Sequence, residues 1–199
     1  MVTCQHLKRS LLFSFLFLIG LISFTSCGDK QADSVQLASM NTPPVNSTKE
    51  SDKRFLASAA EINMEQIMIG KLATQRATSE EVKSFARMVE DAHRDAKVSL
   101  GSIAIIKSIS IPSGTTQAVQ DAYDRLNQEL PETFDQAYIS AVVLGHQNAV
   151  SFLENASRED HDPDVQKWAN TLLTTFRDHL YQARSLEGQI NPMSELIRE

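Results

Sequence analysis

Apolar residues recur with a helical period from Ser51 almost to the end of the chain, and this pattern constrains the fold more than any other feature. Spacings of three and four residues place side chains on one face of a helix, whereas a half-buried strand alternates every second residue. Four apolar stripes of roughly twenty residues each are present, and no segment alternates as a strand would. They run from Phe55 to Ala73, from Val82 to Ile103, from Phe134 to Phe152 and from Val165 to Leu186. The sequence therefore predicts an all-α domain of four long helices.

Helix-start signals separate the four stripes. Thr78 and Glu81 form a capping box that predicts the start of the second helix. Pro131 suits the first turn of the third helix, and Asp162-Pro163-Asp164 supplies a cap, a first-turn proline and an acidic residue for the fourth. The turns near Thr78 and Asp160 are short, so we expect the helices to pair into two αα-hairpins.

The link between the two hairpins is longer than either turn. It covers residues 108–130, contains Pro112 and Gly114, and includes a short amphipathic segment around Tyr123. A link of this length can return along the bundle, as the crossover of ferritin-like folds does. We therefore predict a ferritin-like four-helix bundle whose crossover between the second and third helices contains a short extra helix.

The first residues of the chain predict export. Lys8 and Arg9 precede an apolar run from Leu11 to Phe24, which is short for a transmembrane helix but typical of a signal peptide. Thr25-Ser26-Cys27 then resembles the lipobox of bacterial lipoproteins, in which the cysteine becomes the acylated first residue. We expect Cys27 to anchor the protein to the inner or outer membrane, facing the periplasm or the cell surface. An ordinary cleaved signal and an uncleaved short anchor remain as alternatives.

Composition divides the rest of the chain. Residues 1–26 are the predicted signal, residues 27–50 a flexible tether, residues 51–190 the bundle and residues 191–199 a C-terminal tail. Loss of the two basic residues of the signal would change the formal net charge from −6 to −8. An acidic domain without a basic run is not expected to bind nucleic acid, or to bind anionic lipid by charge. The acyl group would therefore supply the attachment to the membrane.

His93, His146 and His179 each lie near the middle of a different predicted helix. Buried histidines are uncommon in helical cores, so three of them at similar heights indicate where a site would form. The other two histidines are less suggestive. His6 belongs to the signal, and His161 lies in an acidic turn where solvent is its expected partner.

These histidines match a dinuclear metal site only in part. Ferritin-like bundles that hold two ions use a glutamate from each of two helices and a Glu-x-x-His motif from each of the others. Glu90 and His93 have that spacing, but a phenylalanine stands three residues before His179, and the third helix offers His146 in place of a glutamate. A mononuclear zinc, iron or copper site formed by the three histidines and Glu61, with Glu90 as a further candidate ligand, stays open.

A structural role for the histidines is the alternative. Buried imidazoles can form hydrogen bonds that fix the register of the helices, and Gln66, Asp135 and Tyr138 are the candidate partners. The methionines of the first two helices are expected to pack in the core rather than to bind copper. The chain has no nucleophile with an adjacent base, no glycine-rich phosphate loop and no cysteine-based metal motif. This argues against hydrolases, nucleotide-binding proteins and zinc ribbons, and favours a non-enzymatic role.

Four segments of the predicted helices resemble a known bacterial family. They are Ala59 to Ala73, Phe85 to His93, Phe134 to His146 and Asp162 to His179. In order and spacing over residues 52–187, they are similar to the domain of unknown function 4142, a family of ferritin-like four-helix bundles. The resemblance implies an exported, often lipid-anchored protein whose biochemical role is not established.

Two departures from the family pattern bear on a metal site. The family usually has a glutamate where this chain has Gln66, so one candidate ligand is missing or displaced. The family's second-helix histidine directly follows a pair of aspartates, whereas Ala92 here separates Asp91 from His93. An inserted residue would turn the histidine by about 100° around the helix, unless a π-bulge absorbs it.

Two functional hypotheses follow from these features. The first is a lipid-anchored helical bundle with a structural or interaction role in the cell envelope. The second is a metal-binding or redox protein with a site at the middle of the bundle. The sequence specifies no protein partner, and a homo-oligomer is compatible with it.

Overall fold

Five helices and no strand form in residues 45–158 and 161–190, which are the residues that a computed structural model of the chain describes. They are α1 (Val45–Arg76), α2 (Glu80–Ile106), α3 (Gln117–Asn127), α4 (Pro131–Ala156) and α5 (Pro163–Ile190). The prediction of an all-α domain with a short helix in the link is therefore confirmed. The predicted signal, Cys27 and the C-terminal tail lie outside the described residues. None of the described helices has an apolar stretch long enough to cross a bilayer.

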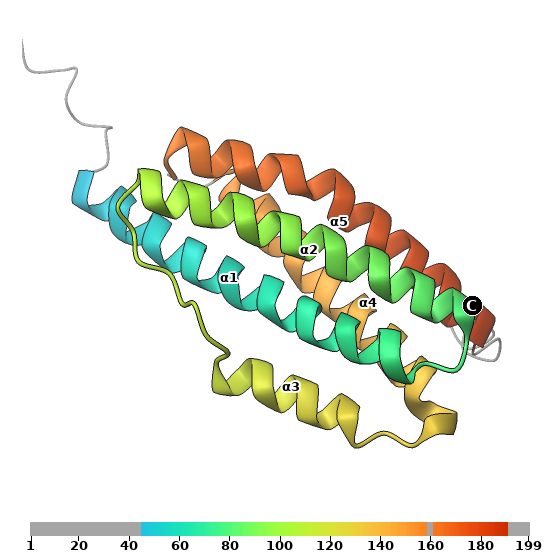
Figure 1. The fold of residues 1–199 in the computed structure, drawn as a ribbon. Helices are drawn as coiled ribbons and strands as arrows, with labels where there is room; N and C mark the ends of the chain where they lie inside the picture. The colour runs from blue at the N-terminus through green and yellow to red at the C-terminus, as the bar shows by residue number, and fades with distance from the viewer. Residues whose placement is uncertain (1–44, 159–160, 191–199) are drawn as a thin grey trace, which may run out of the picture. The chain divides into compact units, whose positions relative to one another are not determined.

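The four long helices form two antiparallel hairpins that pack together as a bundle (Figure 1). α1 pairs with α2 and α4 pairs with α5, while α1 also contacts α4 and α2 contacts α5. The segment after α2 returns along the bundle, and α3 packs against α1 before α4 begins (Figure 1). Because of this crossover, α2 and α4 run in the same direction, which is the connectivity of a ferritin-like fold with one long crossover.

Two helix starts differ from the predicted ones. α1 begins at Val45, ahead of the predicted boundary at Ser51, because the chain between them contains neither proline nor glycine that would interrupt a helix. The N-cap of α2 is Ser79, whose hydroxyl accepts from a backbone N–H of the first turn at 3.3 Å. The predicted cap, Thr78, instead donates its hydroxyl to Asp135 of α4 at 2.7 Å. The predicted capping box is therefore wrong by one residue.

The turn between α4 and α5 is held against α1 by a buried carboxylate. His161, which we expected to face solvent, is 7% exposed, and its Nδ1 lies 2.8 Å from Oδ1 of Asp52. The same oxygen accepts from the backbone N–H of Asp162 at 3.2 Å. The expectation was wrong because the acidic turn folds over the first turns of α1, where the ring of Phe55 also contacts the imidazole. Asp52 thus joins the start of α5 to α1.

A layer of polar side chains divides the core into two apolar clusters. One cluster contains Phe85 and Phe134, and the other contains Phe55 and Trp168. Each long helix contributes apolar residues to both clusters, and buried polar residues of the same helix lie between these two groups of apolar residues. These polar residues are Asn63, Gln66, His93, His146 and His179. Burial of polar groups is unfavourable unless they are hydrogen-bonded or ligated, so this layer is the place to look for a site.

Candidate metal centre

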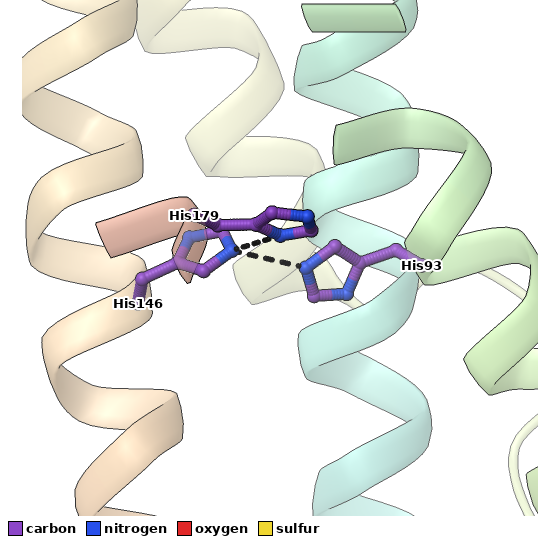
Figure 2. Close-up of side chains that lie close together, drawn as sticks. All are labelled: His93, His146 and His179. Atoms are coloured by element: carbon purple, nitrogen blue, oxygen red, sulfur yellow. Dashed lines mark hydrogen bonds between the residues drawn. The ribbon is translucent and has the colours of Figure 1, made fainter. Parts of the chain in front are cut away.

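Three helices each contribute one imidazole to the polar layer. His93 comes from α2, His146 from α4 and His179 from α5, and Figure 2 shows the three rings converging. The residues are 0%, 0% and 3% exposed, respectively. The structure therefore brings together the three histidines that the sequence placed at similar heights. His146 points inward with the other two.

His146 lies at the centre of the cluster. Its Nε2 is 3.4 Å from Nε2 of His93 and 3.2 Å from Nδ1 of His179, the two contacts dashed in Figure 2. One ring nitrogen from each histidine lies within 4.8 Å of the other two. Among the described residues, no aspartate, glutamate or cysteine joins this group.

The tautomer of His93 is fixed by Asn63 of α1. The Asn63 amide nitrogen donates to the carbonyl of Ala59 at 2.8 Å, and a carbonyl only accepts, so the orientation of the amide is determined. The Asn63 Oδ1 therefore accepts from Nδ1 of His93, which lies 2.8 Å away. A neutral imidazole carries one proton, and here it is on Nδ1. The Nε2 of His93 is left with a lone pair that points at His146.

The tautomer of His146 is fixed in the same way. Its Nδ1 lies 3.1 Å from the backbone carbonyl of Val142, which can only accept, so Nδ1 carries the proton and Nε2 carries a lone pair. Two lone pairs, from His93 and His146, thus face each other across 3.4 Å. A proton on Nδ1 of His179 can be donated to His146. That leaves Nε2 of His93 without a donor among the described residues.

The electrostatics of the layer keep these imidazoles neutral. Burial, with added repulsion from His146 and His179, lowers the pKa of His93 well below its ordinary value. Burial and repulsion from His179 lower the pKa of His146 to about 4, against a smaller opposing effect of the Val142 carbonyl. Burial also lowers the pKa of His179, with Asp178 acting in the opposite direction. Neutral imidazole is the form that binds metal ions.

Phe176 of α5 packs on the cluster of three histidines, which we call the histidine triad. The centre of its ring lies 4.5 Å from that of His93, 5.6 Å from that of His146 and 6.2 Å from that of His179. Phe176 belongs to one of the two apolar clusters that border the polar layer. An apolar shell of this kind limits the access of water to a site and strengthens electrostatic interactions within it.

The two predicted carboxylate ligands do not join the histidines. Glu90 forms an ion pair with Arg94, four residues later on the same helix, and its Oε1 lies 3.0 Å from Nε of that arginine. Glu61 is half-buried on α1 and lies outside the group of ligand atoms. The Glu-x-x-His spacing therefore supplies the cluster with His93 alone.

The predicted hydrogen-bond partners of the histidines are also wrong. Asp135 accepts from the backbone N–H groups of Thr78 and Ser79 and so holds the residues before α2 against α4. Gln66 and Tyr138 are buried, but the Gln66 Oε1 and the Tyr138 hydroxyl have no hydrogen-bond partner among the described residues. The partners are instead Asn63 and the Val142 carbonyl. The sequence signal for Asn63 was its position four residues after Ala59 and three before Gln66, on the buried face of α1.

The extra residue in the second helix does not misdirect its histidine. α2 is α-helical from Glu80 to Ile106, without a π-bulge, and His93 is fully buried. The histidine therefore faces the core despite the additional residue.

Gly145, directly before His146, lies against the side chain of Gln66 on α1. A Cβ added at this position would lie 2.7 Å from Nε2 of Gln66, so the glycine leaves room for the amide.

Comparison with known proteins assigns the chain to a family. The sequence profile of the family described as Domain of unknown function (DUF4142) matches residues 37–186, and the chain belongs to this family. No curated protein matches the chain. The fold is similar to that in a crystal structure of a DUF305 fragment from Deinococcus radiodurans, with a TM-score of 0.62 and 13% sequence identity. The match covers 69% of this chain and 95% of that one, and at this identity it shows a shared fold alone.

Proposed function

We propose that this member of the DUF4142 family binds one transition-metal ion through Nε2 of His93, Nε2 of His146 and Nδ1 of His179. The observation that carries the proposal is the pair of Nε2 lone pairs that face each other across 3.4 Å in a buried layer. Two such acceptors repel unless a cation lies between them. The lowered pKa values of both imidazoles argue against a proton in that place at neutral pH, whereas a metal ion accepts both lone pairs.

The spacing of the nitrogens fits one ion. In a tetrahedral site with metal–nitrogen bonds of about 2.0–2.1 Å, ligand nitrogens lie roughly 3.3–3.4 Å apart. The two shortest separations in the triad are 3.4 Å and 3.2 Å. Imidazole ligands suit zinc, copper and iron. Asn63 and the Val142 carbonyl hold the outer ring nitrogens of His93 and His146, as outer-shell acceptors do at metal-binding histidines.

A purely structural polar layer explains the geometry less well. If the histidines served only to fix the register of the helices, each buried hydrogen-bond donor would be expected to face an acceptor. Here the outer acceptors hold His93 and His146 in tautomers that present two acceptors to each other, and His179 can supply a proton to only one of them. The arrangement therefore favours the metal-binding hypothesis over the structural one.

The surroundings of the triad favour retention of an ion over hydrolysis. A catalytic zinc keeps a coordination position open to water. In this chain Phe176 packs on all three rings, and apolar clusters border the layer on both sides. We therefore propose metal binding, with storage or carriage of the ion, rather than an enzymatic activity.

Metal analysis with site variants tests the proposal. Protein purified without chelators should carry one zinc, copper or iron ion per chain, and metal-free protein should take one up on titration. Replacement of His93, His146 or His179 by alanine should abolish this binding. Tyr138→Phe is the matched control, because it removes a buried hydroxyl without a partner among the described residues and leaves the triad unchanged. Absence of binding by the wild type, or binding by the histidine variants equal to that of the wild type, would contradict the proposal.

We also propose that the protein is exported and anchored by an acyl group on Cys27. The apolar run from Leu11 to Phe24 and the following Thr25-Ser26-Cys27 support this proposal. A Cys27→Ala variant expressed in a bacterial host should lose labelling by a fatty-acid analogue and should leave the detergent phase. Labelling and partitioning equal to those of the wild type would show that the anchor is absent or lies elsewhere.

A further inference from the structure

One end of the bundle exposes a group of aliphatic side chains. Ile105 and Ile106 occupy the last turn of α2 and are 80% and 72% exposed. Val98 lies two helical turns before Ile105, on the same face of the helix, and is also exposed. Single exposed apolar residues are common in proteins, but several at one end of one helix indicate an interaction surface.

A groove of about 350 Å³ between α2 and α5 extends this apolar surface. Ile103 and Ile106 line it from α2, and Trp168 and Leu172 line it from α5. The charged side chains of Lys107, Asp164 and Lys167 also line this groove. The indole N–H of Trp168 donates to the hydroxyl of Ser99 at 2.9 Å, so this polar group already has a partner. We call Val98, Ile105, Ile106 and this groove the apolar end surface.

The start of α1 lies at the same end of the bundle. Lys107, directly after α2, forms ion pairs with Asp162 and Asp164 at the start of α5, with distances of 2.6 Å and 2.7 Å. A neighbouring hollow is lined by Lys49 of α1 together with Ser108. The first turns of α1, the end of α2 and the start of α5 are therefore neighbours, as Figure 1 shows.

The anchor proposed on Cys27 is connected to this end of the bundle. Residues 28–44 link Cys27 to Val45, the first residue of α1. A segment of seventeen residues spans at most about 60 Å even when fully extended. The far end of α1 lies a further 48 Å or so away, since its 32 residues each rise about 1.5 Å. As the predicted flexible tether, residues 28–44 would have a root-mean-square length of roughly 21–25 Å, which is shorter than α1. An acyl group on Cys27 would therefore, on average, lie nearer the apolar end surface than the opposite end of the bundle.

We propose that the apolar end surface docks on the lipid bilayer, with Ile105 and Ile106 inserted among the headgroups and upper acyl chains. This inference rests on the proposed acylation of Cys27. Two isoleucines bind a membrane weakly on their own, but a tether raises their effective concentration at the bilayer so that weak insertion suffices. The site of the metal ion then has a fixed height above the membrane, at the middle of the bundle.

A second copy of the chain is a poorer match for this surface. A stable protein interface buries about 800 Å² on each partner. Three aliphatic side chains and the walls of one groove supply only part of that area. Insertion into lipid has no such threshold, because each apolar group contributes independently to partitioning.

Fluorescence of Trp168 tests the docking directly, since it is the only tryptophan in the chain and lines the groove. The acylated full-length protein is reconstituted into phosphatidylcholine vesicles with or without bromine on the upper acyl chain. We expect brominated lipid to quench Trp168 in the wild type, and an Ile105→Ser, Ile106→Ser double variant to lose this quenching while still floating with the vesicles. Leu144→Ser is the matched control, because Leu144 is exposed on α4, away from this end.

The outcomes separate docking from anchoring. If the wild type does not float with the vesicles, the anchor proposal fails, and docking fails with it. If the wild type floats but Trp168 is quenched equally in the double variant, or not at all, docking is refuted while the anchor stands. Energy transfer between differently labelled chains, together with absent quenching, would show that the surface binds a second copy instead. Equal melting temperatures of the wild type and the double variant verify that the substitutions leave the fold intact.

Discussion

Replacement of Asn63 by alanine tests whether the tautomer of His93 is set for a metal ion. The Asn63 Oδ1 accepts from Nδ1 of His93 at 2.8 Å, and its amide donates to Ala59 at 2.8 Å. Without this acceptor, the Nδ1–H group would be buried and unsatisfied, at a cost of about 1–3 kcal/mol. The imidazole avoids that cost by moving its proton to Nε2, which can then donate to His146 across 3.4 Å.

The tautomer shift lowers metal affinity more than stability. We expect the free energy of unfolding of the metal-free Asn63→Ala variant to fall by about 1 kcal/mol, the net value of one hydrogen bond. Metal binding by this variant requires the unfavourable tautomer, because the ion needs the lone pair on Nε2. Loss of such an outer-shell partner reduces affinity by about 10–100-fold, which corresponds to about 1.4–2.7 kcal/mol.

Chelator competition measures the affinity, and urea denaturation of the metal-free protein measures the stability. Asn63→Asp is the matched variant, because a carboxylate still accepts from Nδ1 of His93 although it cannot donate to Ala59. It should therefore retain most of the metal affinity while losing stability. Equal affinities of the wild type and Asn63→Ala, or an aspartate variant as weak as the alanine variant, would refute the argument.

Three further predictions concern the metal-free protein, and denaturant titration measures each. The free energy of unfolding should fall as pH falls from about 6.5 to 4, because His146 stays neutral in the fold down to a pKa of about 4 while the unfolded chain binds the proton. The loss of unfolding free energy amounts to about 3 kcal/mol at pH 4. A His146→Gln variant whose unfolding free energy falls equally steeply with pH would contradict this prediction. Asp52→Ala should cost about 1–3 kcal/mol, because its carboxylate accepts from a buried imidazole and from a backbone N–H; a change below about 0.5 kcal/mol would show that these bonds contribute little. Gly101→Ala should stabilise α2 by up to about 1 kcal/mol, since no atom lies within 4 Å of the added Cβ. Gly70→Ala should gain less, because its Cβ would lie 3.2 Å from a backbone oxygen, and equal gains would refute this steric argument.

The helical period of the sequence predicted the fold and the meeting of the three histidines. Each histidine lies on a buried face, and its distance from the nearest turn predicted its height in the bundle. The period did not predict Asn63, because the first apolar stripe was defined by apolar residues and Asn63 is polar. The observed buried face includes Leu56 and Asn63 together with Gln66, whereas Ile62, which neighbours Asn63, is only partly buried. A shift of one residue turns a helix by about 100°, enough to replace one candidate partner by another.

The carboxylates could not be assigned from spacing alone. Glu90 and His93 do lie three residues apart on one helix, as a metal-binding motif requires. Arg94 lies four residues after Glu90 and forms an ion pair with its carboxylate, which does not join the cluster. Spacing predicts which side chains share a face, whereas competition between a metal ion and a neighbouring cation depends on three-dimensional contacts.

Binding of the proposed metal ion would make the stability of the bundle depend on the ion. The outer acceptors of His93 and His146 leave two inner lone pairs, and no donor among the described residues can satisfy both. This unfavourable contact is present in the metal-free fold, and binding of the proposed cation would relieve it. Because the unfolded chain does not hold the three imidazoles together, bound metal stabilises the fold by mass action, by about 2.7 kcal/mol at one hundred times the dissociation constant. A shift of several degrees in melting temperature on addition of metal, absent in His146→Gln, is the expected consequence. The same mismatch that lowers the stability of the metal-free protein thus provides the affinity of the proposed site.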